Sequence, residues 1–195
     1  MEQINNLNNF IFPLFSSPIY RAHLNLKTKL IGEFCSKLKT SVKGVIKSNQ
    51  GGWQSPNIPT TDLPILSIEI EKHANIFKDT FLFKNPLKIS DLWVNINTYK
   101  DYNTEHSHPR CIFSGVYYVK IPAKSGEIRF IHPAADMMGC DWSHVEKSDG
   151  NHDNSEQWFF EPKENMLFLF PSWLKHNVSA HLGKKERISI SFNLG

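Results

Sequence analysis

The spacing of hydrophobic and polar positions changes along this chain, from helical in its first part to alternating in its second. Residues 25–42 carry apolar side chains at intervals of three and four, which predicts an amphipathic helix with Asn25 as its N-cap. Residues 61–77 predict a second helix that starts near Asp62 and has a proline in its first turn. The two apolar stripes comprise Leu26, Leu30, Ile31, Phe34, Leu38 and Val42, and then Leu66, Ile70, Ala74 and Phe77.

From residue 87 onward, short β-branched and aromatic segments alternate with turn residues, as is typical of strands. The expected strands are residues 92–99, 112–121, 126–132, 156–162, 166–171, 176–182 and 187–193. Their hairpin-like spacing predicts a sandwich, barrel or jelly roll. Residues 47–60, rich in Gly, Pro and Asn, are expected to lack regular structure, and residues 133–155 to form a lid or an ordered insertion.

A length of 195 residues suits one domain with a substantial core. We expect a single domain over residues 1–195, with helical and loop support in residues 1–86 and a β core in residues 87–195. The net charge of +3 comes from scattered basic residues, which indicates no nucleic-acid patch. Exposed edge strands would allow a homodimer.

The sequence also predicts a cytoplasmic protein. No apolar run approaches the roughly 20 residues that a membrane helix needs, and the first residues lack the basic stretch of a signal peptide. The three cysteines, Cys35, Cys111 and Cys140, lie far apart without a CxxC pattern. That arrangement favours a reducing compartment over a disulfide framework.

Candidate metal chemistry begins at His106 and His108, just before an expected strand. Residues i and i+2 of an extended segment project to the same side, so two imidazoles can bind one divalent ion. Taken alone, the pair is equally well explained as polar residues in a turn. His176 opens a later strand, and a third ligand from a neighbouring strand would complete a facial set on one metal. His181, five residues on, points the opposite way and is the weaker candidate.

Residues 187–193, RISISFN, alternate between polar and apolar side chains. The polar face consists of Arg187, Ser189, Ser191 and Asn193. This face could belong to an edge strand that meets solvent, or it could line a barrel interior that holds an anion. A buried Arg needs an anionic partner, and Arg with a nearby hydroxyl suits a bidentate grip on a carboxylate. The sequence leaves both readings open.

The order HxH, then His, then RxS resembles that of double-stranded β-helix oxygenases that use Fe(II) and 2-oxoglutarate, whose pattern is HxD/E, a distal His and RxS. Six segments resemble more closely a largely uncharacterised family of 2-oxoglutarate/Fe(II) oxygenases: NQGGWQSP, WVNINTY, YNTEHSHP, SGVYYVK, FPSWLKH and RISISFN. They cover most of the chain from residue 48 to residue 193. The resemblance implies a mainly β (α+β) fold, with a jelly-roll (cupin-like) double-stranded β-helix core and N-terminal helices packed on one sheet.

The resemblance also implies roles for individual residues. The metal ligands would be His106, His108 and His176, and the residues that hold 2-oxoglutarate would be Arg187, Ser189 and Tyr99. One of Tyr117 and Tyr118 would face the cavity, because they alternate along a strand. The implied reaction hydroxylates a C–H bond of an unidentified substrate while 2-oxoglutarate is decarboxylated to succinate.

The substrate would be enclosed by residues 51–55 and 133–155. Trp53 and Gln54 in the first segment are candidate substrate contacts, together with whichever tyrosine faces inward. Trp53 and Trp142 would serve as packing anchors or as platforms for the substrate, and packing is the more frequent role of tryptophan.

One residue departs from the general oxygenase pattern: His108 stands where most such enzymes have Asp or Glu. Three histidines bring no ligand charge to offset Fe(II). Glu105 is expected to point away from the metal, and Asp101 to support one of the imidazoles. Two alternatives stay open: a cupin-type metalloenzyme that does not use 2-oxoglutarate, and a non-catalytic jelly-roll binding module. The cupin reading lacks the Glu ligand that would follow HxH.

Overall fold

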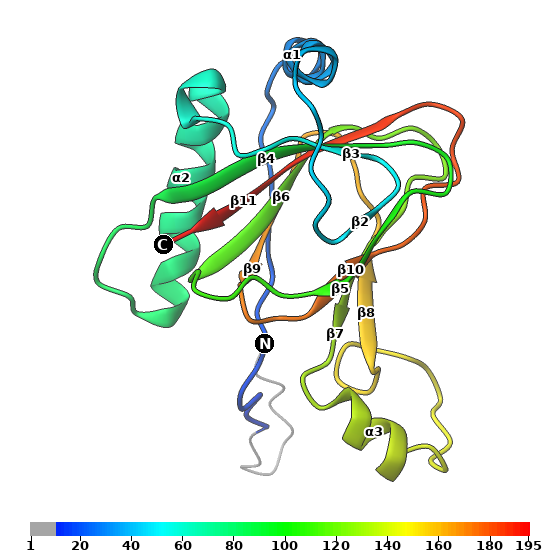
Figure 1. The fold of residues 1–195 in the computed structure, drawn as a ribbon. Coiled ribbons are helices and arrows are strands. Elements are labelled where there is room, and N and C mark those ends of the chain that lie inside the picture. The colour runs from blue at the N-terminus through cyan, green and yellow to red at the C-terminus, as the bar shows by residue number, and fades with distance from the viewer. Residues whose placement is uncertain (1–10) are drawn as a thin grey trace.

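The computed structural model describes residues 11–195, which form two facing antiparallel sheets with helices on one side (Figure 1). The six-stranded sheet has the order β1 (Tyr20–His23), β9 (Met166–Pro171), β6 (Phe113–Lys120), β11 (Arg187–Leu194), β4 (Ile89–Asn97) and β3 (Trp53–Gln54). The five-stranded sheet has the order β2 (Asn49–Gln50), β5 (Tyr102–His106), β10 (His176–Val178), β7 (Ile128–Ile131) and β8 (Gln157–Phe160). This is the predicted jelly-roll class.

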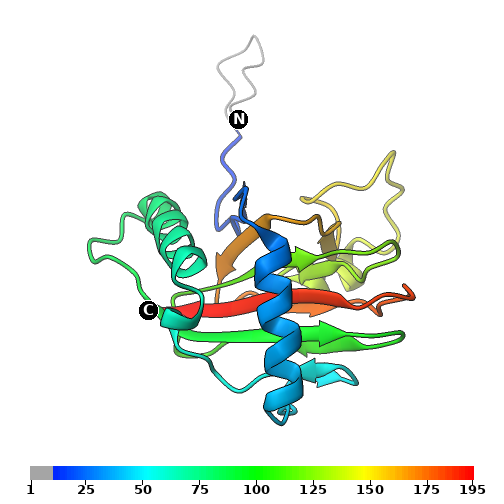
Figure 2. The same ribbon diagram turned by 90° about the horizontal axis from the view of Figure 1, so that it is seen from above.

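Two helices cover the outer face of the six-stranded sheet, as Figure 2 shows. These helices are α1 (Thr28–Ser41) and α2 (Pro64–Lys78), and short 3-10 turns flank α2 at Thr60–Asp62 and Asp79–Phe81. The predicted stripe of α2 is confirmed, because all four of its members are buried. In α1, Leu30 is 58% exposed, so the predicted stripe is wrong at that position.

The predicted N-cap of the first helix is also wrong. Asn25 lies two residues before the Lys27 cap of α1 and has a left-handed φ of 49°, and Asp62 belongs to the 3-10 turn before α2. The proline of α2, Pro64, does occupy its first turn. Neither helix has a side-chain hydrogen bond at its N-cap, so burial of one apolar face holds both helices in place.

The alternation of β6 divides the apolar interior into two clusters. Tyr117 and Val119 face the helices, whereas Val116 and Tyr118 face the space between the sheets. The inner cluster adds Phe168 and further residues of β7 and β9, and it fills only one end of the space between the sheets. The other end is a cavity.

Every predicted strand is present, but the structure also contains strands that were not predicted. These are β1, β2, β3 and β5, and the first three lie in the part of the chain expected to be helix and loop. Within residues 133–155 the structure forms one helix, α3 (Ala135–Asp141), which lies beside β7 and β8 (Figure 1). No helix within residues 11–195 is long and apolar enough to cross a membrane.

Candidate metal centre and co-substrate cavity

Three histidines come together where two strands of the five-stranded sheet meet. His106 ends β5, and His176, which begins β10, lies directly opposite it in the antiparallel register. His108 follows β5, and its backbone N–H donates to the Ser172 carbonyl at 2.9 Å. One candidate ligand atom from each of the three histidines lies within 4.8 Å of the other two. The structure therefore brings the predicted ligand set together.

Backbone carbonyls set the orientation of two of these rings. Nδ1 of His106 lies 2.8 Å from the Thr104 carbonyl, and Nδ1 of His176 lies 2.9 Å from the Leu174 carbonyl. A carbonyl only accepts, so the proton of each ring is on Nδ1 and the lone pair is on Nε2. Nε2 is therefore the available ligand atom of both histidines. The Asp101 carboxylate, expected to support an imidazole, instead accepts from Thr98 in a turn.

Burial keeps the three imidazoles neutral. Burial lowers the pKa of His106. Burial and the charge of the neighbouring His106 lower the pKa of His108 to about 4 and the pKa of His176 to about 3. The Asp91 carboxylate opposes this shift at His108. A metal ligand must be unprotonated, so all three rings are available near neutral pH. Three neutral imidazoles suit iron, zinc or copper, so the donor set fits Fe(II).

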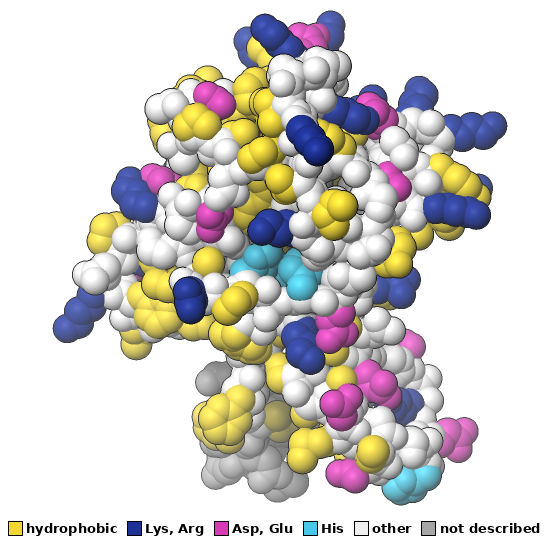
Figure 3. All heavy atoms as spheres, viewed as in Figure 1, with side chains coloured by type: hydrophobic (Ala, Val, Ile, Leu, Met, Phe, Trp, Pro, Cys, Tyr) yellow, Lys and Arg dark blue, Asp and Glu magenta, His cyan; other side chains and the backbone are white. Residues whose placement is uncertain are grey.

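The histidines open onto a cavity of about 580 Å³ between the sheets. In Figure 3, histidine side chains lie at the centre of the hollowed face, and acidic side chains gather below them on the lobe that carries α3. The polar side of β11 lines the cavity with Arg187, Ser189, Ser191 and Asn193. Because β11 is a central strand between β6 and β4, the solvent-facing alternative for these residues is wrong.

Arg187 is buried in this cavity without an acidic partner. Its side chain is 2% exposed, and Nη1 donates to Asn97 Oδ1 at 3.0 Å. Its Nε and the Tyr118 hydroxyl are buried without a hydrogen-bond partner in the part of the chain that the structure describes. Burial lowers the pKa of the guanidinium and raises that of the tyrosine. Unpaired buried donors of this kind are costly, and a bound anion would satisfy both.

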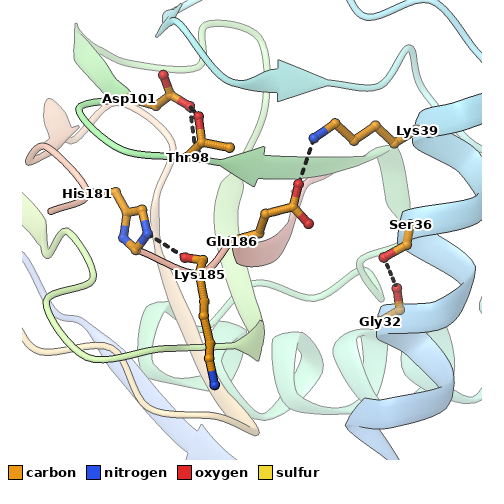
Figure 4. Close-up of polar contacts among 8 residues, drawn as sticks. All are labelled: Gly32, Ser36, Lys39, Thr98, Asp101, His181, Lys185 and Glu186. Atoms are coloured by element: carbon orange, nitrogen blue, oxygen red, sulfur yellow. Dashed lines mark hydrogen bonds and ion pairs between the residues drawn. The ribbon is translucent and has the colours of Figure 1, made fainter. Parts of the chain in front are cut away.

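The residues just before Arg187 are held in place from two sides, as Figure 4 shows. The Glu186 carboxylate pairs with Lys39 of α1 at 2.8 Å. His181 Nε2 donates to the Lys185 carbonyl at 2.7 Å. These contacts fix where β11 begins and thus where Arg187 enters the cavity. His181 therefore positions the start of β11 and is not part of the histidine cluster that could hold a metal.

Tyr118, rather than Tyr117, faces the cavity. The Tyr117 hydroxyl donates to Asn165 Oδ1 at 2.6 Å on the helix side of the sheet. Tyr99 does not line the cavity and is 60% exposed. It lies in the tight turn that Asp101 stabilises between β4 and β5, so its predicted contact with the co-substrate is not supported by its position.

Of the two segments expected to enclose the substrate, only the first contributes to the lining of the cavity. Gln54 lines the cavity. Trp53 instead packs against the apolar cluster between the six-stranded sheet and the helices, and its Nε1 donates to the Val42 carbonyl at 3.3 Å. No residue within 133–155 lines the cavity, and Trp142 is 44% exposed. As predicted, Glu105 points away from the histidines and pairs with Lys175.

Several cavity residues were not predicted from the sequence. Ser48 Oγ lies 3.4 Å from the metal-facing Nε2 of His106 and accepts from Asn103 Nδ2 at 3.1 Å. On β4, the alternate residues Asp91, Trp93 and Asn95 face inward. Alternation in DLWVNIN could have indicated these three positions. Ser48 lies in a segment with no periodic signal.

The fold and site together define a jelly-roll protein in which three clustered histidines, a candidate metal site, share a cavity with a buried arginine. The family model described as "Putative 2OG-Fe(II) oxygenase" matches residues 91–193, which is more than half of the sequence. The chain belongs to this family of Fe(II)- and 2-oxoglutarate-dependent enzymes. No curated protein matches the sequence.

Solved structures with the same fold are distant in sequence. A Pseudomonas putida prolyl-4-hydroxylase is 14% identical, with a TM-score of 0.62 over 91% of this chain and 92% of that one. HygX from Streptomyces hygroscopicus, with nickel and 2-oxoglutarate bound, is 10% identical, with a TM-score of 0.64 over 92% and 83%. The epimerase SnoN, in complex with Fe3+, alpha ketoglutarate and nogalamycin RO, is 11% identical, with a TM-score of 0.67 over 91% and 78%.

Proposed function

We propose that His106, His108 and His176 bind Fe(II) and that Arg187 binds the distal carboxylate of 2-oxoglutarate in an enzyme that hydroxylates its substrate. The observation that carries this proposal is the buried Arg187, which has no acidic partner and lies in the same cavity as the three histidines. A dicarboxylic co-substrate that reaches from the metal to the arginine would neutralise the positive charges of both.

The contacts of the co-substrate follow from the donors that the cavity offers. The guanidinium of Arg187, with its Nε free, suits a carboxylate. Ser189 follows on the same face of β11, and the Tyr118 hydroxyl is the nearby buried donor without a partner. We assign to Tyr118 the contact first expected from Tyr99. Gln54 is a candidate for contact with either small molecule.

The chain's own residues would bind and orient the metal and the small molecules and would exclude water, whereas the reactivity comes from the bound groups. Fe(II) and 2-oxoglutarate, when bound, supply the oxidation in which O₂ hydroxylates a C–H bond as 2-oxoglutarate is converted to succinate and CO₂. The carbonyls of Thr104 and Leu174 hold two ligand rings in one tautomer. Phe170 packs beside His176, with 4.7 Å between ring centroids, and keeps that side of the site dry.

The test is an anaerobic Fe(II) titration with and without 2-oxoglutarate, followed by O₂ and measurement of succinate. We expect a visible charge-transfer band only when protein, Fe(II) and 2-oxoglutarate are all present. Succinate added in place of 2-oxoglutarate is the matched control, because it has two carboxylates but no keto group to chelate the metal. Absence of the band together with absence of succinate formation would refute the proposal.

A cupin-type metalloenzyme without 2-oxoglutarate is the weaker alternative. The cluster that could hold a metal contains no acid within residues 11–195, and a cupin site would leave Arg187 unexplained. Because the matched family is one of enzymes, the match also disfavours the non-catalytic module.

We also propose a cytoplasmic location, supported by three cysteines that are free in the structure. The homodimer and the lack of a nucleic-acid partner stay predictions. The assignment of residues 1–195 to one domain also stays a prediction.

A further inference from the structure

The floor of the cavity has opposite charge at its two ends. Strands β4 and β11 run antiparallel, and Arg187 lies opposite Asn97 at one end, while Asn193 lies opposite Asp91 at the other. Asn193 lies six positions after Arg187 on an extended strand, a span of roughly 20 Å. Both Arg187 and Asp91 line the same cavity. If the arginine end takes 2-oxoglutarate, the Asp91 end is left for the substrate.

The Asp91 carboxylate is held in place but its charge is not neutralised. Asn57 Nδ2 donates to Oδ1 at 2.5 Å, and Asn193 Nδ2 donates to Oδ2 at 3.1 Å. The Ser114 hydroxyl donates to Asn193 Oδ1 at 2.8 Å and thereby fixes that amide. No Lys or Arg within residues 11–195 forms an ion pair with Asp91, and it is the one acidic side chain among the described residues that line the cavity.

An aromatic side chain, Trp93, lies in the cavity beside both Asp91 and the candidate metal ligand His108. Trp93 follows Asp91 on the same face of β4, and its ring centroid lies 5.8 Å from that of His108. An indole face beside a carboxylate is a favourable site for an ammonium or guanidinium group. The half-buried position of both side chains would strengthen this attraction by partial exclusion of water.

We infer that the substrate of this oxygenase carries a positively charged nitrogen group, an amine or a guanidine, which Asp91 binds beside the indole of Trp93. This inference rests on the proposed function, which places 2-oxoglutarate at the opposite end of the cavity. The binding of the cation near His108 would hold an adjacent carbon of the substrate close to the metal. Lys47, which also lines the cavity, has the opposite sign, so the preference for a cation would come from Asp91 alone.

The test uses four small probes that differ mainly in charge: butylamine and butylguanidine, with butanol and butylurea as neutral counterparts. Mn(II) replaces Fe(II) in the full-length protein with 2-oxoglutarate present, and relaxation of the probe protons by the paramagnetic ion reports binding near the metal. We expect relaxation of the two cations to exceed that of the neutral probes. The variant Asp91→Asn should weaken cation binding about tenfold or more, because hydrogen bonds between charged groups are the strong ones.

Glu105→Gln is the matched control, because it removes one negative charge beside His106 but outside the cavity, and it should leave cation binding unchanged. Equal relaxation by charged and neutral probes, or none by either cation, would overturn the inference, and neither result depends on a variant. A loss of Mn(II) affinity in Asp91→Asn with unchanged cation binding would also overturn it, since Asp91 would then offset the charge of the metal. Failure of the proposed function is distinct: the Fe(II)–2-oxoglutarate band would be absent.

Discussion

His106 and His176 face each other across the β5–β10 pair, with their ring centroids 4.4 Å apart. Each ring donates Nδ1–H to the carbonyl two residues before it, which belongs to Thr104 in β5 and to Leu174 in the bend before β10. The two histidines therefore present their Nε2 atoms through the same i−2 hydrogen bond. This pairing makes the candidate metal centre depend on the sheet register, so a change in either strand should alter metal binding.

Replacement of His176 by Ala is expected to lower Fe(II) affinity by more than about 100-fold, because even loss of an outer hydrogen bond to a ligand costs about 10- to 100-fold. Anaerobic titration measures the affinity, and thermal unfolding checks that the variant is folded. His144→Ala removes an exposed histidine of the α3 lobe and is the control. Wild-type affinity in a folded His176→Ala protein would exclude His176 as a ligand.

Arg187→Met should separate co-substrate binding from stability. Loss of the buried charge is expected to weaken 2-oxoglutarate binding about 30-fold or more and to leave Fe(II) binding without 2-oxoglutarate nearly unchanged. The free energy of unfolding without ligand should fall only slightly, because methionine fills a similar volume and removes a buried cation that has no acidic partner, which offsets the hydrogen bond lost at Asn97. Calorimetric titration and denaturant unfolding measure the two effects. A parallel fall in metal binding and in stability would make Arg187 a structural residue.

Tyr118→Phe tests the hydrogen-bond donor that we propose in place of Tyr99. The Tyr118 hydroxyl is buried and interacts with the Arg187 guanidinium, so its removal should destabilise the ligand-free protein only slightly. If that hydroxyl donates to 2-oxoglutarate, the variant should bind 2-oxoglutarate about tenfold more weakly. Tyr99→Phe, at an exposed tyrosine outside the cavity, is the matched control and should bind 2-oxoglutarate normally. The reverse pattern would restore the assignment made from the sequence.

His108→Asp addresses the charge that the three-histidine site lacks. A carboxylate ligand should bind Fe(II) about tenfold or more tightly than wild type in the absence of 2-oxoglutarate, since it adds a negative charge beside the metal. In the wild type, doubly charged 2-oxoglutarate would supply that negative charge, so it should raise Fe(II) affinity more than it does in the variant. Anaerobic titrations with and without 2-oxoglutarate give both values. Equal enhancement in the two proteins would show that ligand charge does not control metal binding.

Short-range periodicity explains why much of the fold and site could be predicted. The two-residue period of β11 identified its polar face, although not that this face points inward, and the stripe through Leu66 and Phe77 identified the buried face of α2. The register that sets His176 opposite His106 joins residues far apart in sequence, and no local pattern specifies it. The family resemblance supplied that link.

The differences between the sequence pattern and the structure have local physical causes. Tyr99 continues the alternation of β4 in sequence, but the Asp101 carboxylate accepts from Thr98 and ends the strand at Asn97. The strands β2 and β3 have two residues each, too few to show a period, and Gly51 and Gly52 between them adopt positive φ. Periodicity therefore failed where a turn contact of one side chain ends a strand and where the strands are too short to show a period.

Cysteine reactivity should report how firmly α1 is docked on the sheet. Cys35 is 0% exposed, and burial raises its pKa to about 12, so its thiol should resist alkylation in the native protein. Exposed Cys140 should react first, and half-buried Cys111, whose pKa burial also raises, more slowly. Mass spectrometry after timed iodoacetamide treatment, with and without denaturant, identifies each site. Modification of Cys35 as fast as Cys140 in the native state would mean that α1 opens readily from the sheet.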